Sequence, residues 1–269
     1  SLPPATPLKY RWKYKEHTII PEEWDLSGKR ALITADRRGW TPHLAVALAE
    51  AGADVAVAGW RTEHVEQAAA AVEAQGKRTI RIVGDIARGE QAQGAVEQVT
   101  EAWGGLDILV NNAQAQFGKP FEDVTEDEWD RLMEYNVRSM FLLCQAAGRQ
   151  MLRQGGGRIV NVISGLAERG LWNSVAYCAS QGAALQITRA LALEWSQRDI
   201  RVNAITAGWL STEEISEEEA NQDPLSRFIP LRRLGHPREV GPLLVYLASD
   251  ACDFVTGQAI AVDGGAIAH

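Results

Sequence analysis

The chain has 269 residues and a formal net charge of −8, and 46% of its residues are hydrophobic. This length allows one large domain or two small ones, and the apolar content is sufficient for a sizeable core. The acidic balance excludes nucleic acid and an anionic membrane as the main partner. Cys144, Cys178 and Cys252 lie far apart and form no CxxC pair. They indicate a reducing compartment and exclude a disulfide framework or a cysteine zinc site.

Two further classes of protein are excluded by pattern. No apolar run approaches the roughly 20 residues that a membrane-spanning helix needs, and the first residues lack the apolar core of a signal peptide. The five histidines are scattered without the spacing of a metal site. We therefore expect a soluble, cytoplasmic protein without a metal centre.

Residues 1–27 differ from the rest of the chain and are expected to form an N-terminal extension. Within them, Lys9–Lys15 alternates basic and aromatic residues, a pattern typical of an extended strand. The extension is either an arm that binds an anion or a partner, or a tail whose aromatic residues pack on its own domain or on a neighbouring subunit.

From residue 28 to residue 269, short apolar runs alternate with helical patterns without an internal linker. Such runs are typical of strands buried on both faces of a parallel sheet. One helix is expected to begin at Thr41-Pro42 with threonine as N-cap, and another to run from the capping box Thr125–Glu128 to Gly155. The pattern predicts a single doubly wound α/β domain with helices on both faces of the sheet. The expected strands are Arg30–Thr34, Asp54–Ala58, Thr79–Val83, Leu106–Asn111, Arg158–Ile163, Arg201–Ile205 and Gln258–Val262.

The turn after the first expected strand, Thr34–Thr41, lies where a dinucleotide-binding domain has its glycine-rich loop. Only Gly39 remains as a glycine there. Ala35 and Thr41 carry side chains at positions where the backbone would approach a phosphate, and Asp36 adds a negative charge that two neighbouring arginines offset. By itself, this turn is weak evidence for a nucleotide.

Other motifs are more specific because they occur in a fixed order and spacing. They are Asn111-Asn112-Ala113, Asn136, Ser164 with Tyr177 13 positions later, Arg201–Ile205, Gly208 with Thr212, Thr256-Gly257-Gln258 and Val262-Asp263-Gly264-Gly265. With these motifs the chain resembles the short-chain dehydrogenase/reductase family over about residues 25–267.

The resemblance implies a seven-stranded Rossmann fold and NAD(P)-linked oxidoreduction of alcohols and carbonyls on a small-molecule substrate. By position, it implies that Tyr177 is the acid/base, that Ser164 hydrogen-bonds the substrate oxygen and that Asn136 supports a proton-relay water. From the residues alone, Ser164 could instead be a turn residue and Tyr177 a half-buried aromatic; their joint spacing favours the functional interpretation. For the cofactor, NADP or NAD, it implies a contact of Asp85 with the adenine and of Thr212 with the nicotinamide amide. The other candidate cofactor contacts are Arg38, Gly39, Arg61, Asn112 and Ala113.

The sequence departs from the family pattern where the cofactor would lie. Gln181 stands where the family has a lysine whose charge lowers the phenol pKa of the tyrosine and holds the nicotinamide ribose. Gln181 can hydrogen-bond ribose, but it has no charge to stabilise a phenolate. Gln114 replaces a glycine and is expected to point toward the nicotinamide ribose, and Ala207 replaces a proline.

Charged residues allow an inference about the ligands. The second expected strand ends without an acid to bind a ribose 2′-hydroxyl, whereas Arg61 and Arg38 could meet the 2′-phosphate of NADP, or could be solvated surface charges. Between Trp209 and Pro230, acidic residues are frequent in the region that forms the family's substrate lid. If they face the substrate, they favour a neutral polar compound; a solvated helix face is the alternative.

Three functions remain open at this point. The first is an NAD(P)-dependent oxidoreductase that tolerates Gln181. The second is a non-redox lyase, isomerase or dehalogenase that uses Ser164 and Tyr177, and the third is a binding or regulatory pseudoenzyme. The apolar content of Ala183–Leu185 and Ala190–Leu193 also predicts a homodimer or homotetramer, assembled through the helices around 126–154 and 174–196.

Overall fold

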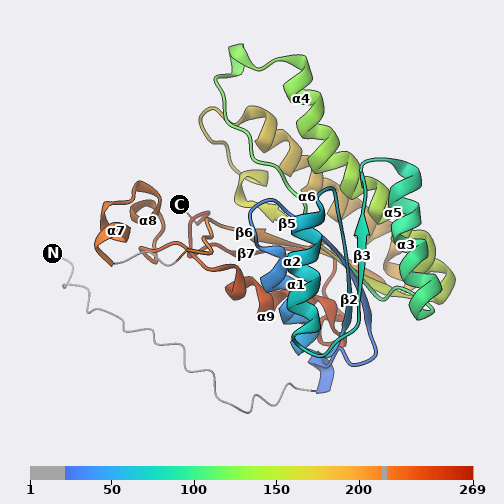
Figure 1. Ribbon diagram of the computed structural model, residues 1–269. Helices are drawn as coiled ribbons and strands as arrows, with labels where there is room; N and C mark the ends of the chain where they lie inside the picture. The colour runs from blue at the N-terminus through green and yellow to red at the C-terminus, as the bar shows by residue number, and fades with distance from the viewer. Residues whose placement is uncertain (1–21, 214–216, 269) are drawn as a thin grey trace.

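The computed structural model describes residues 22–213 and 217–268, and its seven strands form one parallel sheet (Figure 1). The strand order is β3-β2-β1-β4-β5-β6-β7, so the winding reverses between β1 and β4. Ligand sites of such folds lie beyond the carboxyl ends of the strands at this reversal. The strands are β1 (Arg30–Thr34), β2 (Asp54–Gly59), β3 (Thr79–Val83), β4 (Ile108–Asn111), β5 (Gly157–Ser164), β6 (Ile200–Ala207) and β7 (Ala259–Val262).

The expected strands are confirmed, with differences only at their ends. β4 begins at Ile108, two residues later than expected, and β5 and β6 extend to Ser164 and Ala207. The residues inside the central strands are buried, as expected for strands that are covered on both faces. The greater length of β5 makes Ser164 the last residue of a central strand.

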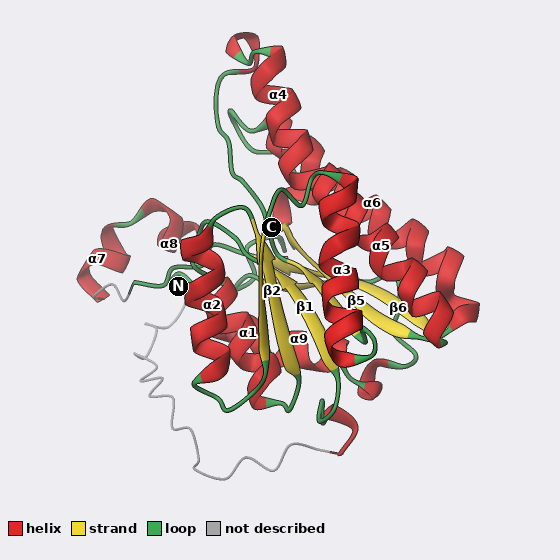
Figure 2. Cartoon of the chain, turned by 45° about the vertical axis from the view of Figure 1, so that its right-hand side comes forward, coloured by secondary structure: helices red, strands yellow, loops and turns green. Residues whose placement is uncertain are grey.

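Helices cover both faces of the sheet, as the strand–helix alternation predicts (Figure 2). Each layer has its own buried core: Leu44 and Leu244 pack with Val57 on one side, and Leu143 and Leu185 pack in the core of the other side. The first layer consists of α1 (Thr41–Glu50), α2 (Thr62–Glu73) and α9 (Gly241–Ala248), and the second of α3 (Gly89–Trp103), α5 (Ser139–Gln154) and α6 (Val175–Trp195).

The remaining helices lie outside these two layers. α4 (Glu126–Met133) extends past the sheet, and α7 (Glu217–Gln222) and α8 (Pro224–Phe228) form a separate lobe (Figure 1). Short 3₁₀ turns occur at Glu22–Trp24, Phe121–Asp123, Gly165–Ala167, Ser196–Arg198, Pro237–Val240 and Asp250–Cys252. The expected basic and aromatic segment Lys9–Lys15 lies outside the described residues.

The start of α1 differs from the expectation. Thr41 is not the N-cap but the first helical residue, and Trp40 occupies the cap without a side-chain hydrogen bond. The Thr41 hydroxyl donates to Asp36 Oδ1 over 2.7 Å and accepts from the Asp36 N–H over 2.9 Å. The N-cap prediction was wrong because this hydroxyl is bound within the preceding loop.

The expected long helix begins and ends as predicted, but it is not regular. Thr125 Oγ1 accepts the Glu128 N–H over 3.2 Å, the Glu128 carboxylate accepts the Thr125 N–H over 2.9 Å, and Gly155 ends the helix with a φ of 96°. Between α4 and α5, Glu134–Arg138 form a π turn. Such turns are frequent at functional sites, and this one contains the buried Asn136.

Two classes of feature are not found in the described ranges 22–213 and 217–268. None of their helices is long and apolar enough to cross a membrane. These ranges also contain no group of three or more His, Cys, Asp or Glu side chains that could hold a metal ion.

Exposed apolar side chains on α5 and α6 agree with the predicted self-association. Phe141 on α5 and Leu193 on α6 are 49% and 81% exposed. We expect light scattering to give a mass of at least twice 29.4 kDa, and Phe141→Glu with Leu193→Glu to lower it toward the monomer. Val83→Glu, on β3, is the control that should leave the mass unchanged. A wild-type particle of 29.4 kDa would contradict this prediction.

Candidate active site

The loop between β1 and α1 is organised around the carboxylate of Asp36, which is 1% exposed. Oδ1 accepts the N–H groups of Trp40 and Thr41 over 3.1 and 3.0 Å, and Oδ2 accepts the N–H of Arg38 over 3.1 Å. Backbone N–H groups at this position in a Rossmann fold are the ones that bind a pyrophosphate. In this chain, the Asp36 carboxylate accepts these N–H groups.

Arg38 lies over this loop with its guanidinium close to an aromatic face. Its Cζ is 3.4 Å from the centroid of the Trp40 ring, and its Nε donates to Asp36 Oδ2 over 3.3 Å. Its Nη2 is buried and has no hydrogen-bond partner among the described residues. The sequence left Arg38 and Arg61 either as contacts of a 2′-phosphate or as solvated surface charges. In the structure, Arg38 lines the cavity beside Tyr177, and Arg61 pairs with Glu63 at the exposed start of α2.

At the expected adenine end, Asp85 is bound to a tryptophan. The Trp60 Nε1–H donates to Asp85 Oδ1 over 2.7 Å, and the N–H of Ala87 donates to the same oxygen over 3.0 Å. The Trp60 ring stacks on Tyr135 with centroids 4.1 Å apart and planes at 19°. An open cavity of about 450 Å³ lies beside these three side chains. The planar indole of Trp60 thus makes the contact with Asp85 that was expected from the adenine.

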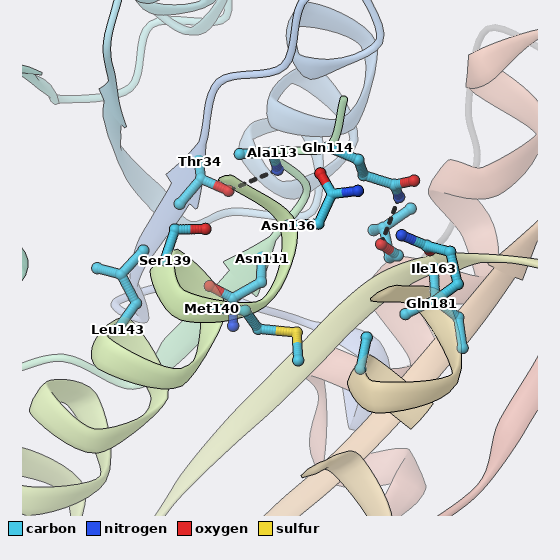
Figure 3. A pocket seen from close by; sticks show the side chains of 12 residues that line it. Thr34, Asn111, Ala113, Gln114, Asn136, Ser139, Met140, Leu143, Ile163 and Gln181 are labelled. Carbon is cyan, nitrogen blue, oxygen red and sulfur yellow. Dashed lines mark hydrogen bonds between the residues drawn. The ribbon is translucent and has the colours of Figure 1, made fainter. Parts of the chain in front are cut away.

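Two glutamines fill the expected nicotinamide end (Figure 3). Gln114 is 3% exposed; its Nε2 donates to the Val162 carbonyl over 2.6 Å, and its Oε1 accepts the Tyr177 hydroxyl over 2.8 Å. Gln181 is also buried, and its Oε1 accepts the Ser164 N–H over 2.8 Å. Gln114 therefore binds the phenol of Tyr177, and Gln181 supports the end of β5.

Asn136 and the Asn112-Ala113 pair have structural partners. Asn136 Oδ1 accepts the Ala115 N–H over 2.7 Å, and its Nδ2 donates to the Ala115 carbonyl and to Ser180 Oγ. The N–H groups of Asn112 and Ala113 both donate to Thr34 Oγ1 over 2.8 Å. The hollow that Asn136 and Gln181 line is only about 10 Å³, about the space of one water molecule. The relay water expected at Asn136 remains a prediction.

A larger cavity of about 290 Å³ opens in front of Ser164 and Tyr177. This volume is close to the lower end of the roughly 300–1,000 Å³ typical of ligand sites, so the ligand is small. Arg38, Arg169 and Gln116 contribute polar groups, and further lining comes from Phe117, Gly118, Gly165, Leu166, Leu171, Ser174, Ala207, Gly208, Trp209, Asp263, Ala266 and Ile267.

Tyr177 has a perturbed pKa for a clear physical reason. Burial raises the pKa of its phenol, while the positive charge of Arg38 and hydrogen bonds from the Ser164 and Gln116 side chains oppose the rise. The phenol is therefore protonated at neutral pH and suited to donate a proton. Arg38 supplies the nearby cation that the sequence lacks at Gln181.

The structure unites only part of the predicted site. Ser164, Tyr177 and Arg38 share the cavity, with Asn136 and Gln181 directly behind it. Thr212 is exposed beside Gly39, which has a φ of 77°. Sequence reasoning missed Trp60 and Arg169, and no motif marks either of them. It noted Asp36 only as a repulsive charge, although an acid inside a phosphate-binding loop could have indicated a replacement for phosphate.

Comparison with known proteins establishes the class. The model of a family described as enoyl-(acyl carrier protein) reductase matches residues 34–266. With the seven-stranded fold and the Ser164–Tyr177 pair, this match shows that the chain belongs to the short-chain dehydrogenase/reductase family.

Individual relatives are dehydrogenases of small hydroxylated compounds. The chain is 37% identical to 2-dehydro-3-deoxy-D-gluconate 5-dehydrogenase from Dickeya dadantii, covering 93% of this chain and 100% of the relative. It is 34% identical to an NAD-dependent glycerol dehydrogenase from Listeria innocua, and the match covers 91% of this chain and 96% of the relative. Among solved structures, a gluconate 5-dehydrogenase from Burkholderia cenocepacia in complex with NADP and tartrate is similar, with a TM-score of 0.83 and 32% identity. The match covers 92% of this chain and 98% of the other.

The residues of this chain do not fit a dinucleotide in the conformation described. The loop N–H groups bind Asp36, the carboxylate of Asp85 binds Trp60, and the hydroxyl of Tyr177 binds Gln114. A pyrophosphate would also lie against the buried negative charge of Asp36. Binding in the family's manner requires the side chains of Asp36, Trp60 and Gln114 to move.

The stability of the loop can test the role of Asp36. Asp36→Asn puts an amide NH₂ among N–H donors and leaves Arg38 without its counter-charge, so we expect a loss of roughly 3 kcal/mol in unfolding free energy. Urea unfolding followed by circular dichroism measures this loss. The matched control Asp127→Asn removes an exposed ion pair with Arg131 and should cost less than about 0.5 kcal/mol. Equal effects in the two variants would contradict the role of Asp36.

Proposed function

We propose that this chain is an enzyme that acts on a hydroxyl or carbonyl group of a small polar substrate. The substrate binds in the cavity of about 290 Å³, Ser164 hydrogen-bonds its reacting oxygen, and Tyr177 exchanges a proton with that oxygen. The observation that carries the proposal is that Ser164 and Tyr177 line the same cavity, which has a suitable size for a small substrate. The relatives, which act on sugar acids and polyols, support this class of substrate.

NAD(P)-linked oxidoreduction is the form of this reaction that the relatives support, because they are dehydrogenases. The chain's own part is to hold the carbonyl oxygen at Ser164 and to deliver the phenol proton of Tyr177 to it. The catalytic set is altered, since Gln181 carries no charge and Arg38 is the cation beside the phenol.

Non-redox chemistry is the second candidate, and a specific observation favours it. Three groups that would bind the dinucleotide have other partners: the loop N–H groups bond to Asp36, Asp85 bonds to Trp60, and the Tyr177 hydroxyl bonds to Gln114. A lyase, isomerase or dehalogenase needs only the cavity, a protonated Tyr177 and the Ser164 hydroxyl. The presence of this intact set favours either enzyme over a pseudoenzyme.

Tyr177 can be tested directly. Tyr177→Phe removes only the hydroxyl and keeps the buried ring, so the fold should persist while turnover falls by roughly 10²–10⁴. The control is Tyr246→Phe, a ring that packs against Trp24 away from the cavity. Turnover with candidate sugar acids and polyols measures the effect, and an unchanged rate in Tyr177→Phe would show that the proton comes from elsewhere.

Titration of NADH and NADPH by fluorescence separates the two forms of the reaction. The double variant Asp36→Gly with Gln114→Gly should raise dinucleotide affinity by at least about tenfold, because it frees the loop N–H groups and the Tyr177 hydroxyl. Circular dichroism establishes that the variant is folded. If the wild type binds as tightly as the double variant, the side chains move aside readily and oxidoreduction is the function; if it binds neither cofactor, the reaction is non-redox.

A further inference from the structure

An arginine with one unpaired N–H donor group lies in the wall of the substrate cavity. The Arg38 guanidinium is 18% exposed, and its Nη2 is buried without a hydrogen-bond partner in the described part of the chain. A buried donor that stays unpaired costs about 1–3 kcal/mol, and more when it is charged. A ligand that accepts from Nη2 would recover this energy once a shift of neighbouring side chains gives it access to this buried atom.

Asp36 does not satisfy the guanidinium. It contacts Arg38 only at Nε, over 3.3 Å, because its two oxygens already accept backbone N–H groups of the loop and the Thr41 hydroxyl. The forked end of the guanidinium is thus left for another acceptor. Trp40 holds its plane in place from one face.

A second guanidinium lines the same cavity. Arg169 Nη1 donates to the Ala266 carbonyl over 2.8 Å, and its Cζ lies 4.8 and 5.8 Å from the ring centroids of Phe228 and Trp209. These contacts fix the side chain while leaving other N–H groups able to donate. An arginine that is held in this way loses little entropy when it binds an anion.

The acid that lines the cavity is bonded to the backbone. Asp263 is the acid among the lining residues, and its two oxygens accept the N–H groups of Gly265 and Ile267, each over 2.8 Å. Of the acids expected in the lid, Glu213 is exposed, and Asp223 caps α8 by accepting the Ser226 N–H over 2.7 Å. Neither of these two lines the cavity, so neither supports the expectation of a neutral substrate.

We propose that the substrate carries a carboxylate that Arg38 and Arg169 recognise, so that the ligand is a small hydroxy acid or keto acid. A planar carboxylate matches the paired N–H groups of a guanidinium. The relatives' names do not decide this point, because they include both an acid and glycerol. The inference deepens the proposed function, which fixes only the reacting end of the ligand at Ser164 and Tyr177.

Calorimetric titration with D-gluconate and D-glucitol tests the proposal, since the two differ only in carboxylate against alcohol at one end. We expect gluconate to bind at least about tenfold more tightly. Glucitol 6-phosphate is the third probe; tighter binding of this compound than of gluconate would assign the site to a phosphate. Equal affinity for gluconate and glucitol would overturn the proposal.

Variants of the loop locate the interaction. Arg38→Gln should weaken gluconate binding by roughly 10- to 100-fold, the loss expected for a charged hydrogen bond, and weaken glucitol binding much less. Arg37→Gln is the matched control, because Arg37 is the exposed neighbour and lies outside this cavity. Arg169→Gln gives a second measurement if Arg38→Gln fails to fold. Equal losses in the control and in the cavity variants would overturn the assignment.

The binding measurement is independent of catalysis. Tyr177→Phe should still bind gluconate with nearly wild-type affinity, since the carboxylate contacts the arginines. Loss of turnover with retained binding supports both proposals. Retained turnover in Tyr177→Phe would overturn the proposed function alone, and loss of the preference for gluconate would overturn the carboxylate site alone.

Discussion

The buried carboxylate of Asp36 determines much of what surrounds it. A Rossmann loop presents N–H groups at the start of its first helix, and such groups must be paired when they are buried. In this chain the Asp36 carboxylate accepts the N–H groups of Trp40 and Thr41. The loop is therefore complete without a phosphate, and its stability does not depend on a bound nucleotide.

The surrounding side chains are consistent with this loop. Ala35 fits because β2 ends in Gly59: a Cβ at Gly59 would lie 2.9 Å from that of Ala35. Arg38 balances the charge of Asp36 and, from the same position, opposes the rise in the pKa of Tyr177 caused by burial. The acid in this turn is thus linked to the cation that lies beside the Tyr177 phenol.

The sequence predicts the architecture well because the signals are local or periodic. Apolar runs locate all seven strands to within a few residues, and the spacing of Ser164 and Tyr177 predicts their common site. It does not predict where flexible polar side chains point. The bond of Gln114 to Tyr177 depends on the position of β5, and the pairing of Trp60 with Asp85 joins the ends of β2 and β3. Such contacts follow from tertiary packing, on which single-residue patterns carry no information.

The π turn Glu134–Arg138 directs two neighbouring side chains to different parts of the molecule. Tyr135 stacks on Trp60, whereas the next residue, Asn136, bonds to Ala115 and Ser180, so one wide turn serves two separate walls. A π turn holds about one residue more than the 3.6 residues of an α-helical turn, and it absorbs this residue locally. Deleting one residue here would therefore give a regular helix and leave the faces of α4 and α5 nearly where they are. The surplus residue lets two neighbouring side chains reach separate walls without turning one helix against the other.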